Sequence, residues 1–118
     1  MTKTTTNKIA ELNDRFRKAT GSSDPAGISL GRKFLTSGVR ALGLEASVAI
    51  AERVMAFDSF TADNDPYEEH DFGSVDYEGQ RIFWKIDYYD RRKEFLSPDP
   101  ADPKVTCRVL TIMLSSEY

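Results

Sequence analysis

The stretch FGSVDYEGQRIFWKIDYYD, residues 72–90, predicts a β-hairpin. Residues 72–77 form the first strand, and Glu78-Gly79 supplies the tight turn, because glycine accepts the positive φ that a hairpin loop requires. The second strand covers residues 81–90. Its side chains alternate between an apolar row (Ile82, Trp84, Ile86, Tyr88) and a mixed row (Arg81, Phe83, Lys85, Asp87, Tyr89). The alternation predicts a sheet with one covered face and one wetter face.

Further elements surround the hairpin. Residues 105–115 form a strand that is apolar on both sides, which is typical of a central strand, and residues 32–36 form a short strand. Residues 5–20 form a helix with a narrow stripe of Ile9, Leu12 and Phe16, capped by Thr5 or Thr6 and ended by Gly21. Residues 44–58 form a second helix with a broad apolar face, in two rows: Leu44, Val48, Ala51, Met55 and Ile50, Val54, Phe57.

These elements predict one α+β domain over residues 1–118, with two main helices packed on a three- or four-stranded antiparallel sheet. Residues 1–31 are its N-terminal helix and loop, and residues 32–118 are its α+β core. The 118 residues and the 40% apolar composition suit one globular domain. The lone Cys107 lies in an apolar run, which predicts a buried thiol.

The composition also limits location and partners. The first twenty residues lack the apolar segment of a secretory signal, and no apolar run is long enough to span a bilayer, so we expect a soluble, cytoplasmic protein without membrane contact. The net charge of −3 argues against general affinity for nucleic acid, since binding to phosphates needs clustered Lys and Arg. We expect no cofactor.

Charge is spread unevenly along the chain. Residues 58–90 hold ten carboxylates against Arg81 and Lys85, and the same stretch gathers many of the aromatic residues. An acidic, aromatic segment is neither an ordinary core nor an ordinary loop, so we place the functional site there. Its centre is the irregular loop FTADNDPYEEHDFG, residues 60–73, because structureless connections of this length tend to be functional or mobile.

The predicted site combines an acidic surface with aromatic contacts. The acidic surface consists of Asp63, Asp65, Glu68, Glu69, His70 and Asp71, and the aromatic contacts are Tyr67, Phe83 and Tyr89. A calcium-loop reading starting at Asp63 would need glycine at Glu68 and glutamate at Ser74, so we expect no metal. Lys85 and Asp87 share a strand face, and Arg108 would join them in a charged row if the last strand is their neighbour.

His70 carries the alternative hypothesis. It is the only histidine, and Glu69 or Asp71 would orient it as a general base. No Gly-x-Ser-x-Gly motif accompanies it, and Cys107 falls in mid-strand, so the sequence offers no activated nucleophile. A small enzyme or metal-binding module centred on His70 and its neighbouring carboxylates is therefore the second choice.

Three stretches, FTADNDPYEEHDFGSV, IFWKIDYYD and DPADPKVTCRVLTIMLSSEY, together resemble a family of small bacterial proteins of unknown function (a DUF). The resemblance covers roughly residues 34–118 and implies an accessory gene, often carried by plasmids or other mobile elements. It assigns no chemistry to any residue.

The favoured hypothesis is a non-enzymatic binding protein. Its acidic surface would attract a basic protein or a nucleoprotein complex through the long-range electrostatic field. Together with the implied mobile-element context, a more specific form of this hypothesis is an anti-CRISPR-like inhibitor of a host defence complex that binds nucleic acid. The carboxylates of the inhibitor would then occupy the places of nucleic-acid phosphates. A third hypothesis is a homo-oligomer that the acidic loop merely keeps soluble.

Overall fold

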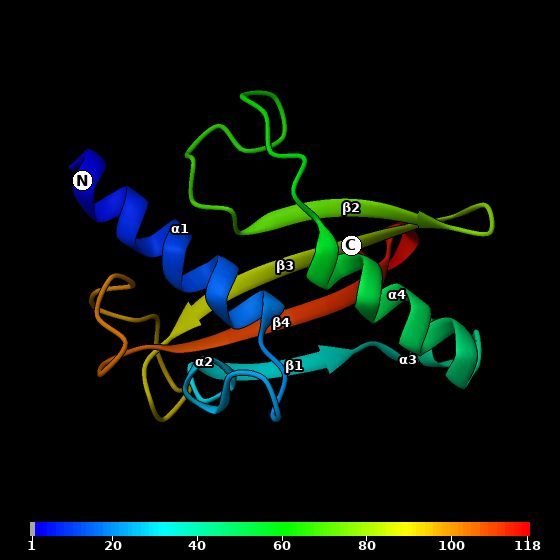
Figure 1. The fold of residues 1–118 in the computed structure, drawn as a ribbon, viewed down its shortest axis with the longest axis horizontal. Coiled ribbons are helices and arrows are strands. Elements are labelled where there is room, and N and C mark those ends of the chain that lie inside the picture. Colours follow the sequence, from blue (N-terminus) through cyan, green and yellow to red (C-terminus); the bar gives the residue numbers. More distant parts are fainter. Residues whose placement is uncertain (1) are drawn as a thin grey trace.

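The computed structural model describes residues 2–118 and shows an α+β fold (Figure 1). The first half of the chain contains two helices, one strand and two more helices, and three strands follow in the second half. In chain order the elements are α1 (Lys3–Lys18), α2 (Pro25–Ile28), β1 (Gly31–Leu35), α3 (Ser37–Arg40), α4 (Leu44–Ala56), β2 (Phe72–Tyr77), β3 (Gln80–Tyr89), β4 (Cys107–Leu114) and the 3₁₀ turn η1 (Ser115–Glu117).

The predicted hairpin is confirmed as β2 and β3, which pair antiparallel over residues 72–77 and 80–85. Its turn residues Glu78 and Gly79 have φ values of 46° and 83°. Two successive positive φ angles match the right-handed twist of the flanking strands, which explains the tight connection.

The four strands lie in the order β1-β4-β3-β2. The last strand, β4, is central, as its two apolar rows predict. The expectation of an antiparallel sheet is wrong for one pair, because β1 runs parallel to β4, with Gly31 opposite Arg108 and Leu35 opposite Ile112. The chain between these two strands contains α3, α4 and the hairpin, which is the long crossover that a parallel pair needs.

Both long helices pack on the same face of the sheet (Figure 1). Ile82, Trp84 and Ile86 of β3 face them and are buried, which confirms the predicted alternation. From the helices, the same core receives Leu12 and Phe16 of α1 and Ile50 and Val54 of α4. A core of this kind fixes α1 and α4 relative to each other and to the sheet.

Two helix predictions need correction. In α4 the row that starts with Leu44 and Val48 does not face the core: Leu44 is 82% exposed, and Ala46 and Ser47 are buried instead. In α1 the cap is Thr2, whose hydroxyl accepts the Thr5 amide, and the helix ends before Ala19. The region between α1 and β1 contains the short helix α2 rather than loop alone.

The opposite face of the sheet, here called the open face, carries Arg32, Phe34, Val109, Thr111, Phe83, Lys85 and Asp87. Phe34 is 49% exposed and Thr111 is half-buried, so no described helix covers this area. Lys85 and Asp87 form an ion pair of 2.9 Å there. The predicted row with Arg108 is wrong, because Arg108 lies opposite Tyr88 and faces the helices, where it is buried.

The predicted burial of Cys107 is confirmed. Among the helices of residues 2–118, none has both the length and the apolar character needed to cross a membrane.

Candidate functional site

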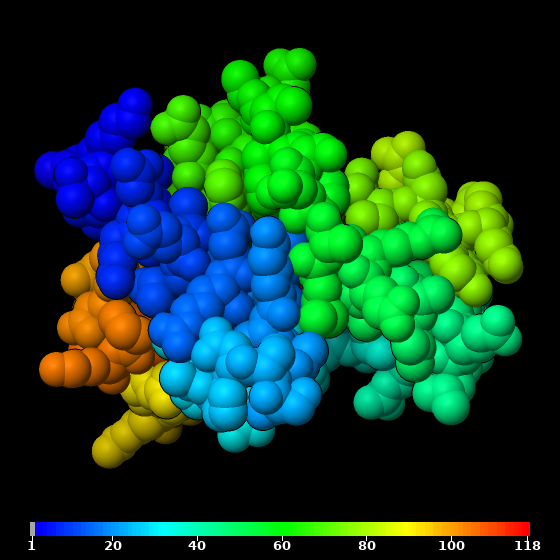
Figure 2. Space-filling model, in the orientation of Figure 1, coloured from blue at the N-terminus to red at the C-terminus, as the bar shows by residue number. Residues whose placement is uncertain are grey.

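A groove of about 580 Å³ separates the exposed side of α1 from the acidic loop, residues 57–71, which connects α4 to β2. In Figure 2 the surfaces of α1 (blue) and of this loop (green) adjoin. We call it the acidic groove because four carboxylates and one lysine line it. Its lining residues are Lys3, Asn7, Ala10, Glu11 and Asp14 of α1, and Phe60, Thr61, Ala62, Asp65, Glu68 and His70 of the loop.

The acidic loop is ordered by its own short side chains. Asn64 accepts the Thr61 amide at 2.8 Å and donates to the Ser59 carbonyl at 2.9 Å. Asp65 is only 6% exposed, and its carboxylate accepts the His70 amide at 3.2 Å. Such local bonds are the reason that Asn, Asp and Thr favour turns. Asp65 therefore stabilises the loop from inside.

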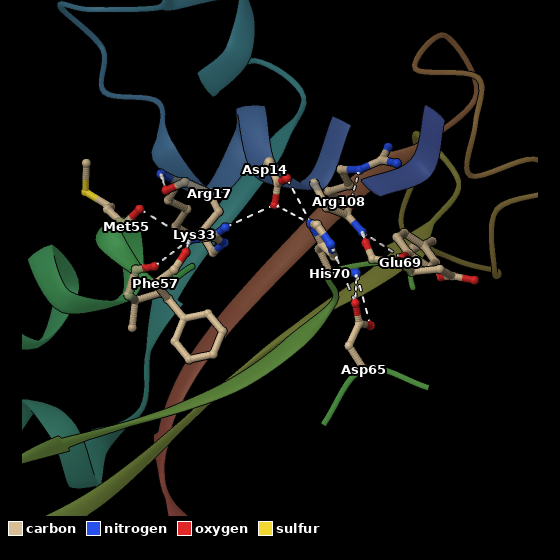
Figure 3. A network of polar contacts seen from close by, with 12 residues as sticks. Asp14, Arg17, Lys33, Met55, Phe57, Asp65, Glu69, His70 and Arg108 are labelled. Atoms are coloured by element: carbon tan, nitrogen blue, oxygen red, sulfur yellow. Dashed lines mark hydrogen bonds and ion pairs between the residues drawn. The ribbon is translucent and has the colours of Figure 1, made fainter. Parts of the chain in front are cut away.

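His70 joins the loop to α1 (Figure 3). Its Nδ1 lies 2.9 Å from Asp14 Oδ2, and since an ionised carboxylate only accepts, Nδ1 carries the hydrogen. Its Nε2 lies 3.7 Å from Asp65 Oδ2, beyond hydrogen-bond distance. The ring also stacks on Phe60, with centroids 3.9 Å apart and planes within 1°. His70 is thus held on one face by Phe60 and at one nitrogen by Asp14.

Arg17 extends this contact to the end of α4. Its Nη1 donates to the carbonyls of Val54 (2.8 Å) and Phe57 (2.9 Å) at the end of that helix, and its Nη2 donates to Asp14 at 3.0 Å. Burial lowers the pKa of the Arg17 guanidinium, against the raising effect of Asp14. A cation at a helix C-terminus is favourable, so Asp14 and Arg17 together fix α4, α1 and the acidic loop.

A second polar network lies under α1. Asn13 Nδ2 donates to the Tyr88 hydroxyl at 2.8 Å and to the Glu69 carbonyl at 2.9 Å, while Asn13 Oδ1 accepts Arg108 Nε at 2.7 Å. Tyr88 in turn donates to Glu69 Oε1 at 2.8 Å, and burial raises the Tyr88 pKa well above its ordinary range. Arg108 Nη2 donates to the Pro100 carbonyl at 2.6 Å. Asn13 and Tyr88 therefore both bridge helix, loop and sheet.

Asp71 is the last residue of the acidic loop and directly precedes β2. Burial raises the pKa of its carboxyl to about 6, and the negative charge of Glu69 adds to the effect. A carboxyl with this pKa changes charge just below neutrality.

The structure divides the predicted site residues between two faces. Asp63 and Glu68 are exposed, Tyr67 is 80% exposed, and Asp65 is buried. Glu69, His70 and Asp71 are half-buried, and of these Glu69 bonds Tyr88 and His70 bonds Asp14. Phe83 and Tyr89 lie on the open face, on the other side of the sheet, where Phe83 packs against Phe72 and Tyr118. The loop residues and the two strand aromatics do not form one surface, and their role in binding stays a prediction.

Sequence reasoning missed the contribution of α1. The sequence pattern assigned neither Asn13 nor Arg17 to a site. Both Asn13 and Arg17 are fully buried, next to Leu12 and Phe16. A signal was present, because Asn13 and Arg17 are four residues apart and border the apolar stripe.

In the part of the chain that the structure describes, no group of three or more His, Cys, Asp or Glu side chains is arranged to hold a metal ion. Among the carboxylates near His70, Asp14 accepts from Arg17, Asp65 accepts the His70 amide, and Glu69 accepts from Tyr88.

Residues 35–117 match the family model of a protein of unknown function, DUF3768. Because the match covers more than half of the chain, the protein belongs to this family. No curated protein and no solved structure matches the chain. The matched segment contains the acidic loop with His70 and Asp65, whereas α1, with Asn13, Asp14 and Arg17, precedes it.

Proposed function

We propose that this member of a family of unknown function is a binding protein whose acidic groove receives a basic segment of another protein. One observation carries the proposal: Glu11 on α1 and Glu68 on the acidic loop line the same groove, both are exposed, and neither carboxylate has a hydrogen-bond or ion-pair partner among residues 2–118. The other two carboxylates of the groove, those of Asp14 and Asp65, are engaged internally.

The groove is suited to a cation because the wall around His70 is ordered before binding. Asp14 and Asp65 hold His70, and Phe60 supports its ring, so little ordering of the wall is needed when a partner enters. A guanidinium or ammonium between Glu11 and Glu68 would find two carboxylates and an aromatic floor. Charge complementarity of this kind chiefly raises the association rate and the specificity.

The more specific form of the proposal is that the partner is a nucleoprotein defence complex of the host and that the protein is an accessory factor of a mobile element. Here Glu11, Glu68 and the exposed Asp63 would stand where nucleic-acid phosphates otherwise bind. Support comes from the resemblance of residues 34–118 to small bacterial proteins of mobile elements and from the exposed position of these three carboxylates. Binding of this type weakens as salt screens the charges.

A pair of charge-matched variants tests the proposal. Tagged wild-type protein, the groove variant Glu11→Lys/Glu68→Lys and the control Glu52→Lys/Glu94→Lys are used to capture proteins from host lysate at low and high salt. Glu52 and Glu94 are exposed and lie away from the groove. We expect a basic partner that the wild type and the control retain at low salt and that the groove variant loses. Equal capture by all three proteins would refute the groove as the binding site.

The Asp14–His70 contact also favours a second candidate function, an acid–base catalyst. Asp14 fixes the tautomer with hydrogen on Nδ1, which leaves Nε2 as a base beside the groove. No hydroxyl or thiol of residues 2–118 hydrogen-bonds Nε2, so the structure contains no adjacent nucleophile, and we rank catalysis second. A panel of chromogenic esters and phosphoesters, assayed with wild-type protein and His70→Asn, distinguishes the two: binding alone predicts no turnover by either.

A further inference from the structure

A second pocket, which shares no residue with the acidic groove, has the opposite charge. It measures about 310 Å³ and is lined by Ser29, Gly31, Arg32, Arg91, Lys93 and Cys107. We call it the basic pocket. It contains three cationic side chains and no carboxylate. Arg91 Nη1 donates to the Thr106 carbonyl at 2.8 Å, which anchors that guanidinium.

These cations are not neutralised by the protein. Among residues 2–118, none of Arg32, Arg91 and Lys93 forms an ion pair. Asp90, the neighbour of Arg91 in sequence, accepts the Glu94 amide at 3.0 Å and does not line the pocket. Three unpaired cations around one cavity form a site for an anion, although the chain as a whole has a net charge of −3.

The basic pocket opens onto the open face of the sheet. Residues that are paired in register point to the same face of a sheet. Arg32 pairs with Val109 and Cys107 pairs with Tyr89, so the side chains of Arg32 and Cys107 lie on the open face. Phe34 follows Arg32 by two residues on the same strand and therefore lies on the same face, about 7 Å further along. Its ring is half exposed, so a flat ligand can reach it.

The remaining charges of the open face cancel. Lys85 pairs with Asp87 at 2.9 Å, and Arg81 pairs with Asp76 at 2.8 Å. The surface therefore offers net positive charge at the basic pocket and aromatic and apolar area beside it, at Phe34 and Val109. A ligand that matches both must combine an anionic group with a flat unsaturated ring.

We propose that the basic pocket binds a backbone phosphate of single-stranded nucleic acid and that Phe34 stacks on a neighbouring base. Proteins that bind single strands combine a cationic track for the backbone with aromatic rings for the bases, and in several of them these lie on an exposed sheet. The proposal is independent of the acidic groove, because the two sites share no residue. An acidic peptide would satisfy the three cations and leave Phe34 without a role.

The test measures fluorescence anisotropy of a labelled twelve-nucleotide single strand of mixed sequence, titrated with the full chain at 50 and 200 mM salt. The charge variant is Arg32→Ser/Lys93→Asn, in which asparagine tolerates the φ of 61° at position 93. The control Lys8→Ser/Lys18→Asn removes the same charge from the exposed side of α1. The stacking variant is Phe34→Ser.

We expect the wild type and the control to bind alike, with affinity that falls with salt. The charge variant should bind at least tenfold more weakly and lose about 1.4 units of the slope of log affinity against log salt, because each cation that contacts a single strand contributes about 0.7 units. Phe34→Ser should bind about tenfold more weakly with an unchanged slope, since stacking releases no counterions.

Three outcomes would overturn the proposal. The first is no anisotropy change with the wild type at 50 mM salt. The second is an equal loss of binding in the charge variant and the control, which would indicate only net charge. The third combines two results: Phe34→Ser binds the strand normally, and the strand is fully displaced by inorganic phosphate, a mononucleotide or polyglutamate at equivalent charge concentration. The pocket would then be a site for small phosphates or acidic peptides.

Discussion

Asp14 and His70 are 56 positions apart in the sequence, yet Asp14 Oδ2 lies 2.9 Å from His70 Nδ1. The same carboxylate receives the buried guanidinium of Arg17, which in turn binds the carbonyls at the end of α4. One side chain of α1 thus positions both the acidic loop and α4. The shape of the acidic groove depends on this contact, because the groove lies between the elements that it joins.

Substitution of Asp14 should therefore destabilise the fold. Asp14→Ala leaves Arg17 buried without its carboxylate and frees His70, so we expect the free energy of unfolding to fall by about 2–3 kcal/mol. Urea denaturation measures this change. Glu11→Ala, on the same helix but without hydrogen bonds, is the control and should stay within about 0.5 kcal/mol of wild type. Similar values for the two variants would show that the Asp14 contacts do not form in solution.

Asn13 offers a second test of the buried polar contacts. Asn13→Ala removes hydrogen bonds to Tyr88, to the Glu69 carbonyl and to Arg108, and leaves buried polar groups without partners, which should reduce the free energy of unfolding by about 2–3 kcal/mol. The control is Asn7→Ala, an exposed asparagine on the same helix. A stability loss that is no larger at Asn13 than at Asn7 would contradict the network.

Asp71 predicts a specific dependence of stability on pH. Its pKa is about 6 in the folded protein and near 3.8 in the unfolded chain, so between these values the folded state holds a proton that the unfolded state has released. Stability should then fall as pH rises from about 4 to 6, by an amount on the order of 1 kcal/mol because the group is partly exposed. Asp71→Asn removes this titration and should be more stable than wild type above pH 6. Parallel stability profiles from pH 4 to 7 would exclude the effect.

The family-matched segment alone should not fold as it does in the whole chain. Residues 35–117 lack α1, which supplies Leu12 and Phe16 to the core and Arg17 to the end of α4. We expect this fragment to show no cooperative thermal transition by circular dichroism, whereas the full chain shows one. A cooperative transition in the fragment, with native-like strand signal, would mean that α1 is an accessory element.

The hairpin, the central last strand and the buried row of β3 were predictable because they depend on local pattern: alternation, a glycine turn and apolar character on both sides. The parallel pairing of β1 with β4 was not, since it depends on how a short strand returns to the sheet after a long crossover. The prediction that Leu44 and Val48 face the core was wrong because α4 has more apolar residues than its buried face can hold.

Only one side of the candidate site, the acidic loop, was predicted from the sequence. The acidic loop and His70 were found from composition, because ten carboxylates in residues 58–90 stand out in any chain of this size. Their partners on α1 were missed, because charged residues on a helix are usually solvated, and only the fold brings Asp14 and Arg17 under the loop. The basic pocket was also hidden, since Arg32 and Lys93 are far apart in sequence and net charge averages over both sites.

The most direct test of the acidic groove uses a fluorescent nona-arginine peptide as a basic probe. Anisotropy titrations compare wild type, Glu11→Lys/Glu68→Lys and Glu52→Lys/Glu94→Lys; each pair of substitutions shifts the net charge from −3 to +1. We predict that the groove variant binds the peptide at least tenfold more weakly than the control of equal charge. Equal affinities for the two variants would contradict it, since net charge alone would then explain the binding.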